Sequence, residues 1–241
     1  MRINVISTAK QAESTDFSGK TVVMIDVLRA SSVMTTALWM GAKAILPVLT
    51  PEDALQEYSR FEAGTALLCG EREARRIEGF HLGNSPLEFT REAVQDKIII
   101  HTTSNGTRAT NAAHKADQLY VLSFLNMNAV AMHLSEQSTD LSIICSGTDE
   151  QFSMDDALCA GMLISILSKE IPIETDDLAS TLKSFSETEP SNLRSKLNSC
   201  KHLNYLIQKG FEKDIDFCLQ MNTMPIVLSH NGRLIISDQR F

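Results

Sequence analysis

The chain lacks several features that would assign it to whole classes of protein. No apolar run reaches the roughly 20 residues that a membrane-spanning helix needs, and the opening MRINVISTAKQAES holds no hydrophobic signal-peptide segment. Lysine and arginine form no block, and the formal net charge is −8, so nothing favours nucleic acid as a partner. We therefore expect a cytoplasmic protein that acts without a membrane or a nucleic acid.

Cysteine is scarce as well. The 241 residues hold five cysteines without CxxC spacing, which indicates reduced thiols and argues against a disulfide framework or a zinc site. Cys145 ends an apolar run with no base beside it in the sequence, which favours a core residue over a nucleophile. The GxxxxGK[ST] motif of P-loop proteins is also missing, and there is no DxDx motif of the usual aspartyl-phosphatase type.

The first two thirds of the chain contain a regular alternation of strand and helix patterns. The predicted strands are short apolar runs rich in valine and isoleucine, which is typical of strands buried on both faces. They span residues 2–6, 21–28, 44–49, 66–70, 97–103, 118–122 and 141–146. Helix starts are predicted at Thr50, Ser85 and Ser153, and the last of these helices runs through Leu167.

The last third of the chain has a different pattern. Residues 175–221 are helical in pattern, and Asn231-Gly232 between two apolar runs predicts a hairpin over residues 225–237. The whole sequence predicts an α/β fold, a three-layer α/β/α arrangement around a largely parallel or mixed sheet. We expect one domain over residues 1–241, in which 175–241 forms a helical cap and a terminal hairpin.

Polar residues gather where four predicted strands end, which is where ligands bind in parallel α/β sheets. In chain order they are Asp26 and Arg29; Glu71 and Arg72; Thr103, Ser104, Asn105, Gly106 and Arg108; and Ser146, Gly147 and Asp156. Carboxylates suit a hard cation such as Mg²⁺, while arginines and exposed backbone N–H groups suit an anion. These strand ends therefore predict a site for a small anionic ligand.

Each group also has a purely structural interpretation. Asp26 needs a partner because burying a lone carboxylate is costly, and an ion pair with Arg29 would supply one. The segment 102–108, TTSNGTR, could be a turn that caps a helix. Glu71 and its neighbour could be solvated, and Asp156 could simply belong to the first turn of a helix.

The stretch 79–90, GFHLGNSPLEFT, has two parts. Its second part has the order of a helix start, with Ser85 as N-cap, proline at the first helical position and Glu88 three residues after the cap. The loop before it, which contains His81 and Asn84, is richer in glycine and polar groups than a purely structural loop requires. It is a second candidate for the site.

Seven stretches carry a more specific signal. They are VVMIDVLRASSVMTTAL (22–38), AILPVLTPEDAL (44–55), GEREARRIEGFHLGNSPLEFT (70–90), TTSNGTRAT (102–110), SFLN (123–126), CSGTDEQFSMDDALCAG (145–161) and DIDFCLQ (214–220). In content and order they resemble the 2-phosphosulfolactate phosphatases, the ComB-like family of coenzyme M biosynthesis. The resemblance implies a three-layer α/β/α fold. It also implies Mg²⁺-dependent hydrolysis of 2-phospho-3-sulfolactate, or a similar phosphorylated hydroxy acid, to 3-sulfolactate and phosphate.

The resemblance also implies roles for matching residues. The metal-ligand candidates are Asp26, Glu71 and Asp156; the catalytic candidates are Asp26, Arg29, Asn84, Ser85, Asn105 and Arg108; the substrate-binding candidates are Arg29, Arg72, Thr103, Ser104, Gly106, Arg108, Ser146 and Gly147. The substrate of the family carries a phosphate, a carboxylate and a sulfonate, which several arginines and a metal would match. A homodimer stays an open hypothesis.

The chain departs from the family pattern at three places. The family usually has Asp where His81 and Asn222 stand, and Gly within the stretch that residues 149–151 occupy here. The lost carboxylates would matter if either one touched the metal or the attacking water. The alternative hypothesis is therefore a diverged, non-catalytic relative that binds a small sulfonate or phosphate ligand.

Overall fold

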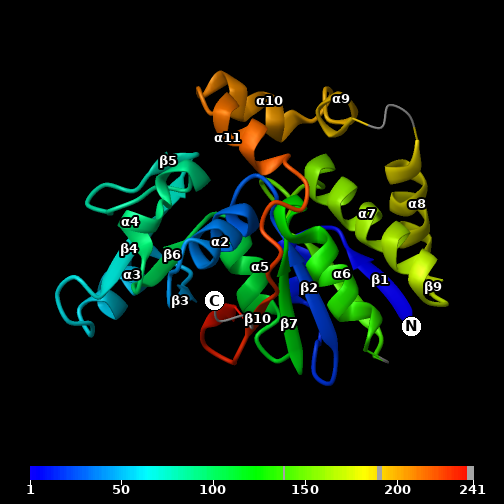
Figure 1. Cartoon of the computed structure of the whole chain (residues 1–241), viewed down its shortest axis with the longest axis horizontal. Helices are drawn as coiled ribbons and strands as arrows, with labels where there is room; N and C mark the ends of the chain where they lie inside the picture. The colour runs from blue at the N-terminus through cyan, green and yellow to red at the C-terminus, as the bar shows by residue number, and fades with distance from the viewer. Residues whose placement is uncertain (138, 189–191, 238–241) are drawn as a thin grey trace.

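The computed structural model describes residues 1–137, 139–188 and 192–237 (Figure 1). Within these residues, eleven strands form one mixed sheet flanked by helices, which confirms the predicted α/β class. The strands are β1 (Arg2–Ile6), β2 (Thr21–Ile25), β3 (Ala44–Pro47), β4 (Ala66–Arg72), β5 (Arg75–Arg76), β6 (Ile98–Thr102), β7 (Gln118–Leu122), β8 (Leu141–Cys145), β9 (Glu174–Thr175), β10 (Leu228–His230) and β11 (Ile235–Ser237).

The helices follow the predicted alternation. They are α1 (Ala9–Glu13), α2 (Ala30–Trp39), α3 (Pro51–Tyr58), α4 (Arg91–Val94), α5 (Gly106–Ala112), α6 (Met127–Ser135), α7 (Met154–Glu170), α8 (Asp177–Glu187), α9 (Leu193–Lys196), α10 (Lys201–Gln208) and α11 (Glu212–Cys218), with 3₁₀ turns at Pro86–Glu88 and Phe124–Asn126. The hydroxyl of Thr50 caps α3 as predicted, since it accepts from the N–H of Asp53 at 3.0 Å. Helix α7 starts after Ser153 as predicted and continues three residues beyond Leu167.

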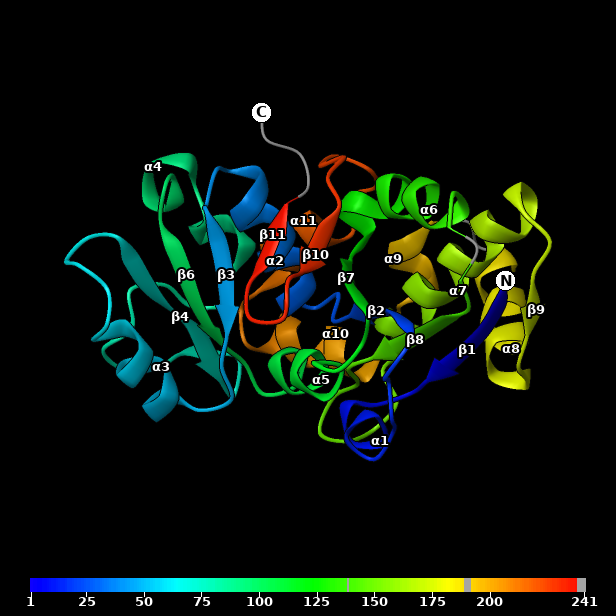
Figure 2. The ribbon, with the colours of Figure 1, turned by 90° about the horizontal axis from the view of Figure 1, so that it is seen from below.

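The strand order is β5-β4-β6-β3-β11-β10-β7-β2-β8-β1-β9. Two parallel blocks stand out, β4-β6-β3 and β7-β2-β8-β1-β9. Between them lies the antiparallel hairpin β10–β11, which pairs with β7 on one side and β3 on the other (Figure 2). The predicted hairpin is therefore real, but it joins the two halves of the sheet and is not part of a cap.

The sheet is covered on both faces because its strands alternate in what they bury. In β2, Val22 and Met24 pack on one face, among residues of α1, α2 and α5, whereas Val23 and Ile25 pack on the other, among residues of α6, α7 and α8. Helix α3 packs against β3, β4 and β6 in a third apolar cluster. This arrangement gives the expected three layers, and Cys145 lies in the core as predicted.

Two local predictions need correction. Strand β2 ends at Ile25, three residues earlier than predicted, because the chain turns at Asp26, whose backbone carbonyl accepts from the N–H of Ser31 at 2.8 Å. The helix predicted at Ser85 is only the 3₁₀ turn Pro86–Glu88, without a capping box. The Ser85 hydroxyl donates to Asp214 at 2.8 Å instead, and Glu88 accepts from the N–H of Gly83.

Helices α9, α10 and α11 gather beyond the carboxyl ends of the strands (Figure 1). We call residues 193–218 the cap. The cap is the part of the predicted helical region that covers the strand ends, where the polar segments of the sequence also meet. Across the described ranges, no helix is both long and apolar enough to span a bilayer.

The hairpin position makes a prediction about stability. Ile235 is fully buried opposite Ile45, so Ile235→Ala should lower the free energy of unfolding by about 2–5 kcal/mol. Its neighbour Ile236 is only half-buried, and Ile236→Ala is the matched control, with an expected loss less than half as large. Urea unfolding of both variants measures the difference. Equal, small losses would mean that the hairpin lies outside the core.

Candidate active site

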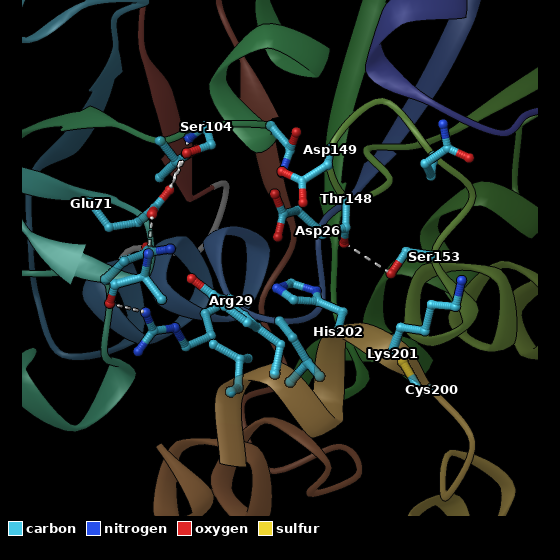
Figure 3. A pocket seen from close by; sticks show the side chains of 18 of the residues that line it. Asp26, Arg29, Glu71, Ser104, Thr148, Asp149, Ser153, Cys200, Lys201 and His202 are labelled. Atoms are coloured by element: carbon cyan, nitrogen blue, oxygen red, sulfur yellow. Dashed lines mark hydrogen bonds between the residues drawn. The ribbon is translucent and has the colours of Figure 1, made fainter. Parts of the chain in front are cut away.

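A cavity of about 860 Å³ lies between the strand ends and the cap (Figure 3). Four strand-end loops and the start of α10 form its walls. The lining residues used below are Asp26, Arg29, Glu71, Arg72, Asn84, Thr103, Ser104, Asn105, Thr148, Asp149, Ser153, Cys200, Lys201, His202 and Tyr205. Segments that are far apart in the chain are thus brought to one place by the parallel arrangement of the strands.

Asp26 is the carboxylate placed by the turn after β2. It is 8% exposed, and its Oδ1 accepts from the N–H of Ala30 at 3.2 Å. Burial raises the pKa of Asp26 from its ordinary 3.8 to about 6, although the nearby His202 and the Ala30 N–H act in the opposite direction. Its partner is not Arg29, so the ion pair considered from the sequence does not form.

Glu71, at the end of β4, is fixed by hydrogen bonds from two loops. Its Oε1 accepts from both the backbone N–H and the hydroxyl of Ser104, each at 2.9 Å, and its Oε2 accepts from the N–H of Ala74 at 2.9 Å. The loop 103–105 therefore supplies donors to a protein carboxylate, whereas the sequence predicted donors for a bound anion. Thr103 and Asn105 line the same wall of the cavity.

The two predicted arginines of the cavity differ in how far their charge is neutralised. Arg29 is buried, its Nη1 lies 2.6 Å from Asp214 of the cap, and its guanidinium stacks over Phe211 at 4.1 Å. Arg72 donates to the backbone carbonyls of Glu71 and Leu49 and forms no ion pair among the described residues. Arg72 is therefore the better placed of the two to attract an anion.

Asn84 is held by a buried histidine that the sequence did not suggest. His101 of β6 has no exposure, and its Nε2 lies 3.0 Å from Asn84 Oδ1. Burial lowers the pKa of His101 to about 4, so the ring is neutral and has one N–H, while its Nδ1 has no partner in the structure. A buried acceptor without a partner is better tolerated than a buried N–H donor without one. The proton therefore lies on Nε2 and faces Asn84 Oδ1, and the amide N–H groups of Asn84 point away from the ring.

An acid–histidine pair, Asp155 and His202, completes the cavity, and the sequence did not suggest it either. Asp155 is buried, accepts from the Ser153 hydroxyl, and lies 3.8 Å from Nδ1 of His202. Burial alone would raise the pKa of Asp155, but His202 and Ser153 outweigh it and hold that pKa below its usual value. Burial alone would lower the pKa of His202, but Asp155 and Asp26 raise it above the usual value.

Three predicted residues, Ser146 and Gly147 after β8 and Asp156 in the first turn of α7, form a brace and do not line the cavity. Asp156 is buried and accepts from the N–H groups of Val27, at 2.9 Å, and Gly147, at 3.0 Å. Burial raises the pKa of Asp156 well above its usual value, and Asp155 and Asp26 add to the effect. The Ser146 hydroxyl contacts Met24. This brace ties the loop after β8 to the loop after β2.

Three other candidates also lie behind or outside the cavity. Gly106 backs Asp26 so closely that an added Cβ would lie 2.7 Å from Asp26 Oδ2, which explains the glycine. Ser85 is buried against Asp214. Arg108 does not line the cavity and pairs with Glu13 at 2.9 Å and Glu150 at 3.5 Å. The structure thus does not bring Arg108 to the anion site that the sequence predicted.

The chain is similar to known proteins over nearly its whole length. The family described as "2-phosphosulpholactate phosphatase" matches residues 6–232. The chain belongs to this family. It is 40% identical to a "Probable 2-phosphosulfolactate phosphatase" of Clostridium perfringens strain 13 over 97% of this chain and 96% of the relative. It is 38% identical to the one of Caldanaerobacter subterraneus subsp. tengcongensis over the full length of both, and 35% identical to that of Clostridium acetobutylicum over 98% and 100%.

Of the three departures from the phosphatase family pattern, the stretch 149–151 contributes Asp149 and Gln151 to the cavity wall, whereas His81 and Asn222 do not line the cavity. His81 is exposed, its Nδ1 accepts from the N–H of Leu68 at 3.0 Å, and its ring packs against Tyr58. Asn222 has φ of +58°, which Asn and Asp tolerate well, and its Oδ1 accepts from the N–H of Asn128 at 2.8 Å. Both side chains act as acceptors for backbone N–H groups, a task that an aspartate could also perform.

The cavity fits a magnesium ion held by few protein ligands. Asp26 Oδ2 accepts no hydrogen bond from the described residues, and Glu71 lies on the adjoining wall (Figure 3). Mg²⁺ commonly binds one or two carboxylates and takes its other oxygens from water and substrate phosphate. Asp156 does not fit this set because it does not line the cavity. Within the described ranges, no group of three or more acidic, histidine or cysteine side chains is arranged to hold a metal.

The buried Asp26 carboxylate is expected to serve the site while it lowers the free energy of unfolding. Its pKa is higher in the folded state, about 6, than its ordinary 3.8, so the free energy of unfolding falls as the pH rises through this window. Asp26→Asn removes that loss and should be more stable than the wild type by about 1–3 kcal/mol at pH 8, and by less at pH 4. Urea unfolding without divalent cations tests this.

The exposed Asp53 supplies the control for this measurement, because Asp53→Asn should leave stability within about 0.5 kcal/mol at both pH values. A wild type more stable than Asp26→Asn at pH 8 would contradict the predicted effect of burial on Asp26.

Proposed function

We propose that this chain is a Mg²⁺-dependent phosphatase that hydrolyses 2-phospho-3-sulfolactate, or a similar phosphorylated hydroxy acid, to the hydroxy acid and phosphate. The observation that carries the proposal is the cavity at the strand ends, where Asp26 and Glu71 face Arg72 and the cap residues Lys201 and His202. Family membership and the relatives' names support the same reaction. The coenzyme M pathway and a cytoplasmic location, which the five free, buried cysteines suit, complete the proposal.

The charges around the cavity suit the substrate. Phosphate, carboxylate and sulfonate groups need several positive charges close together, although the chain as a whole carries −8. Arg72, Lys201 and His202 supply cationic groups from two opposite walls. Several cationic groups around one cavity favour a ligand with more than one anionic group over a lone phosphate.

Asp26 and Glu71 would hold the magnesium ion. When bound, the metal supplies positive charge to the phosphoryl oxygens and lowers the pKa of a water molecule. The protein groups then position the ester: the amide N–H groups of Asn84 point away from His101 and are free to donate to a phosphoryl oxygen, and Arg72 adds a forked donor. Phosphoryl transfer needs charge neutralisation and alignment more than it needs covalent chemistry.

The alternative, a relative that binds its ligand without turnover, was motivated by His81 and Asn222. Neither residue lines the cavity, and each has a structural task where it stands. The departure at 149–151 does line the cavity, through Asp149 and Gln151, but it adds a carboxylate and an amide and removes no side chain that the proposed reaction uses. We therefore propose the catalytic function.

Substitution of Asp26 tests the site. Asp26→Asn removes a charge that would hold the metal, and phosphate release from 2-phosphosulfolactate should fall at least about a hundredfold. Asp53→Asn, an exposed carboxylate on α3, is the control and should keep wild-type turnover. Since the Asp26 variant should fold at least as stably, a loss of activity cannot be assigned to unfolding. Undiminished turnover in Asp26→Asn would refute the proposed site.

Removal of the metal tests the cofactor. After treatment with EDTA and gel filtration, phosphate release should stop, and added Mg²⁺ should restore it. Ca²⁺ at the same concentration should restore less, because it is larger and prefers more ligands than two carboxylates provide. Full turnover of the metal-stripped protein would show that magnesium plays no part in the reaction.

A further inference from the structure

The proposed reaction needs a proton donor, since the alkoxide that leaves phosphorus is a poor leaving group unless it is protonated. We propose that His202 of the cap is this general acid and that Asp155 is the residue that positions it. The inference rests on the proposed phosphatase function. It identifies a role for the cap, which the polar strand ends of the sheet do not supply.

The geometry of the imidazole carries the inference. Figure 3 shows His202 extending from α10 into the cavity toward Asp26. Its Nδ1 lies 3.8 Å from Asp155 Oδ2, an ion-pair distance, so this nitrogen faces the protein. Its Nε2 has no hydrogen-bond partner among the described residues and is left to face a ligand. The side chain is 16% exposed, enough for contact with the cavity.

Asp155 is itself held in place from two directions. The Ser153 hydroxyl and the Cys200 thiol, at 3.6 Å, both donate to its Oδ1, which leaves Oδ2 directed at His202. A carboxylate fixed in this way sets the ring orientation and stabilises the imidazolium form, as the acid does in acid–histidine pairs generally. The side chain of Asp155 is 1% exposed, so little water competes for it.

The charged groups around His202 favour its protonated form. Burial and the charge of Arg29 lower the pKa of His202, whereas Asp155 of α7, its ion-pair partner, raises it, and the net shift is upward. Lys201 is its cationic neighbour on α10. The contact with Asp155 stabilises the imidazolium form that a general acid needs.

Other donors in the cavity are less suitable. Burial raises the pKa of the Cys200 thiol to about 12, and the thiol already donates to Asp155. The Tyr205 hydroxyl donates to the backbone carbonyl of Glu73 at 3.3 Å. His202 is the sole imidazole among the lining residues that the structure describes.

The oxygen of a water molecule forms a bond to phosphorus while the bond from phosphorus to the ester oxygen breaks. The Nε2 proton of His202 passes to that ester oxygen, which becomes the hydroxyl of the hydroxy acid. The protons of the attacking water remain with the phosphate product, and one of them returns to His202 directly or through solvent.

The test exploits the leaving group. His202→Gln keeps a polar side chain but cannot transfer a proton, so turnover of 2-phosphosulfolactate, which releases an alkoxide, should fall about 10²- to 10³-fold. Turnover of 4-nitrophenyl phosphate, whose leaving group needs no proton, should fall less than about tenfold. Asp155→Asn should show the same contrast at smaller size. His114→Gln, an exposed histidine far from the cavity, is the matched control and should show no change.

The outcomes separate the two proposals. A large loss with the alkyl ester and a small loss with the aryl ester supports His202 as the acid. Equal losses with both esters, or no loss with either, overturn that role while leaving the phosphatase function standing. A wild type that releases phosphate from neither ester overturns both proposals. Circular dichroism melting curves of each variant establish that the fold is retained.

Discussion

The cavity depends on one buried ion pair, between Arg29 of the loop after β2 and Asp214 of the cap. Their side chains are 3% and 5% exposed, and 2.6 Å separates the paired atoms. The hydroxyl of Ser85 also donates to Asp214, and Arg29 donates to the carbonyl of Ala74. Breaking such a pair by removing one partner leaves an uncompensated buried charge and typically costs about 3–5 kcal/mol. This network fixes where the cap lies over the strand ends.

Three buried carboxylates lie close to this pair, and their proximity to one another is unfavourable for folding. Asp26, Asp155 and Asp156 are all buried and close enough for their charges to interact, which raises the pKa values of Asp26 and Asp156. The three carboxylates differ in their hydrogen-bond partners. Asp156 accepts from two backbone N–H groups, and Asp155 contacts a hydroxyl and a histidine. Asp26 accepts from one backbone N–H group through Oδ1. The least satisfied carboxylate faces the ligand cavity. That is the pattern of a site kept reactive at the expense of stability.

The sequence predicted those features of the structure that interactions between nearby residues determine. Apolar runs gave the strands, and the parallel arrangement that follows from them placed Asp26, Glu71, Arg72 and the loop 103–105 around one cavity. The errors came from tertiary partners. Nothing near Ser85 indicates that Asp214, 129 residues away, takes its hydroxyl, and nothing near Arg108 indicates Glu13 on another helix.

The sequence did not indicate two histidines of the site, again because their positions depend on tertiary contacts. His101 lies in the pattern of an apolar strand, and His202 lies in a polar helical region without a motif. The fold nevertheless places His101 against Asn84 and His202 in the cavity that Asp26 also lines. The only usable signal was the similarity of residues 214–220 to the family, which marks the cap as part of the common structure. The position of the hairpin β10–β11 inside the sheet likewise depends on long-range pairing with β3 and β7.

The division of the cavity between sheet and cap has a consequence for specificity. The carboxylates that suit a metal belong to the strand ends, whereas Lys201 and His202 belong to α10. A ligand with an anionic group at each end would contact both walls. Because the Arg29–Asp214 pair joins the loop after β2 to the cap, the same contact that holds the cap in place also fixes the two walls relative to each other.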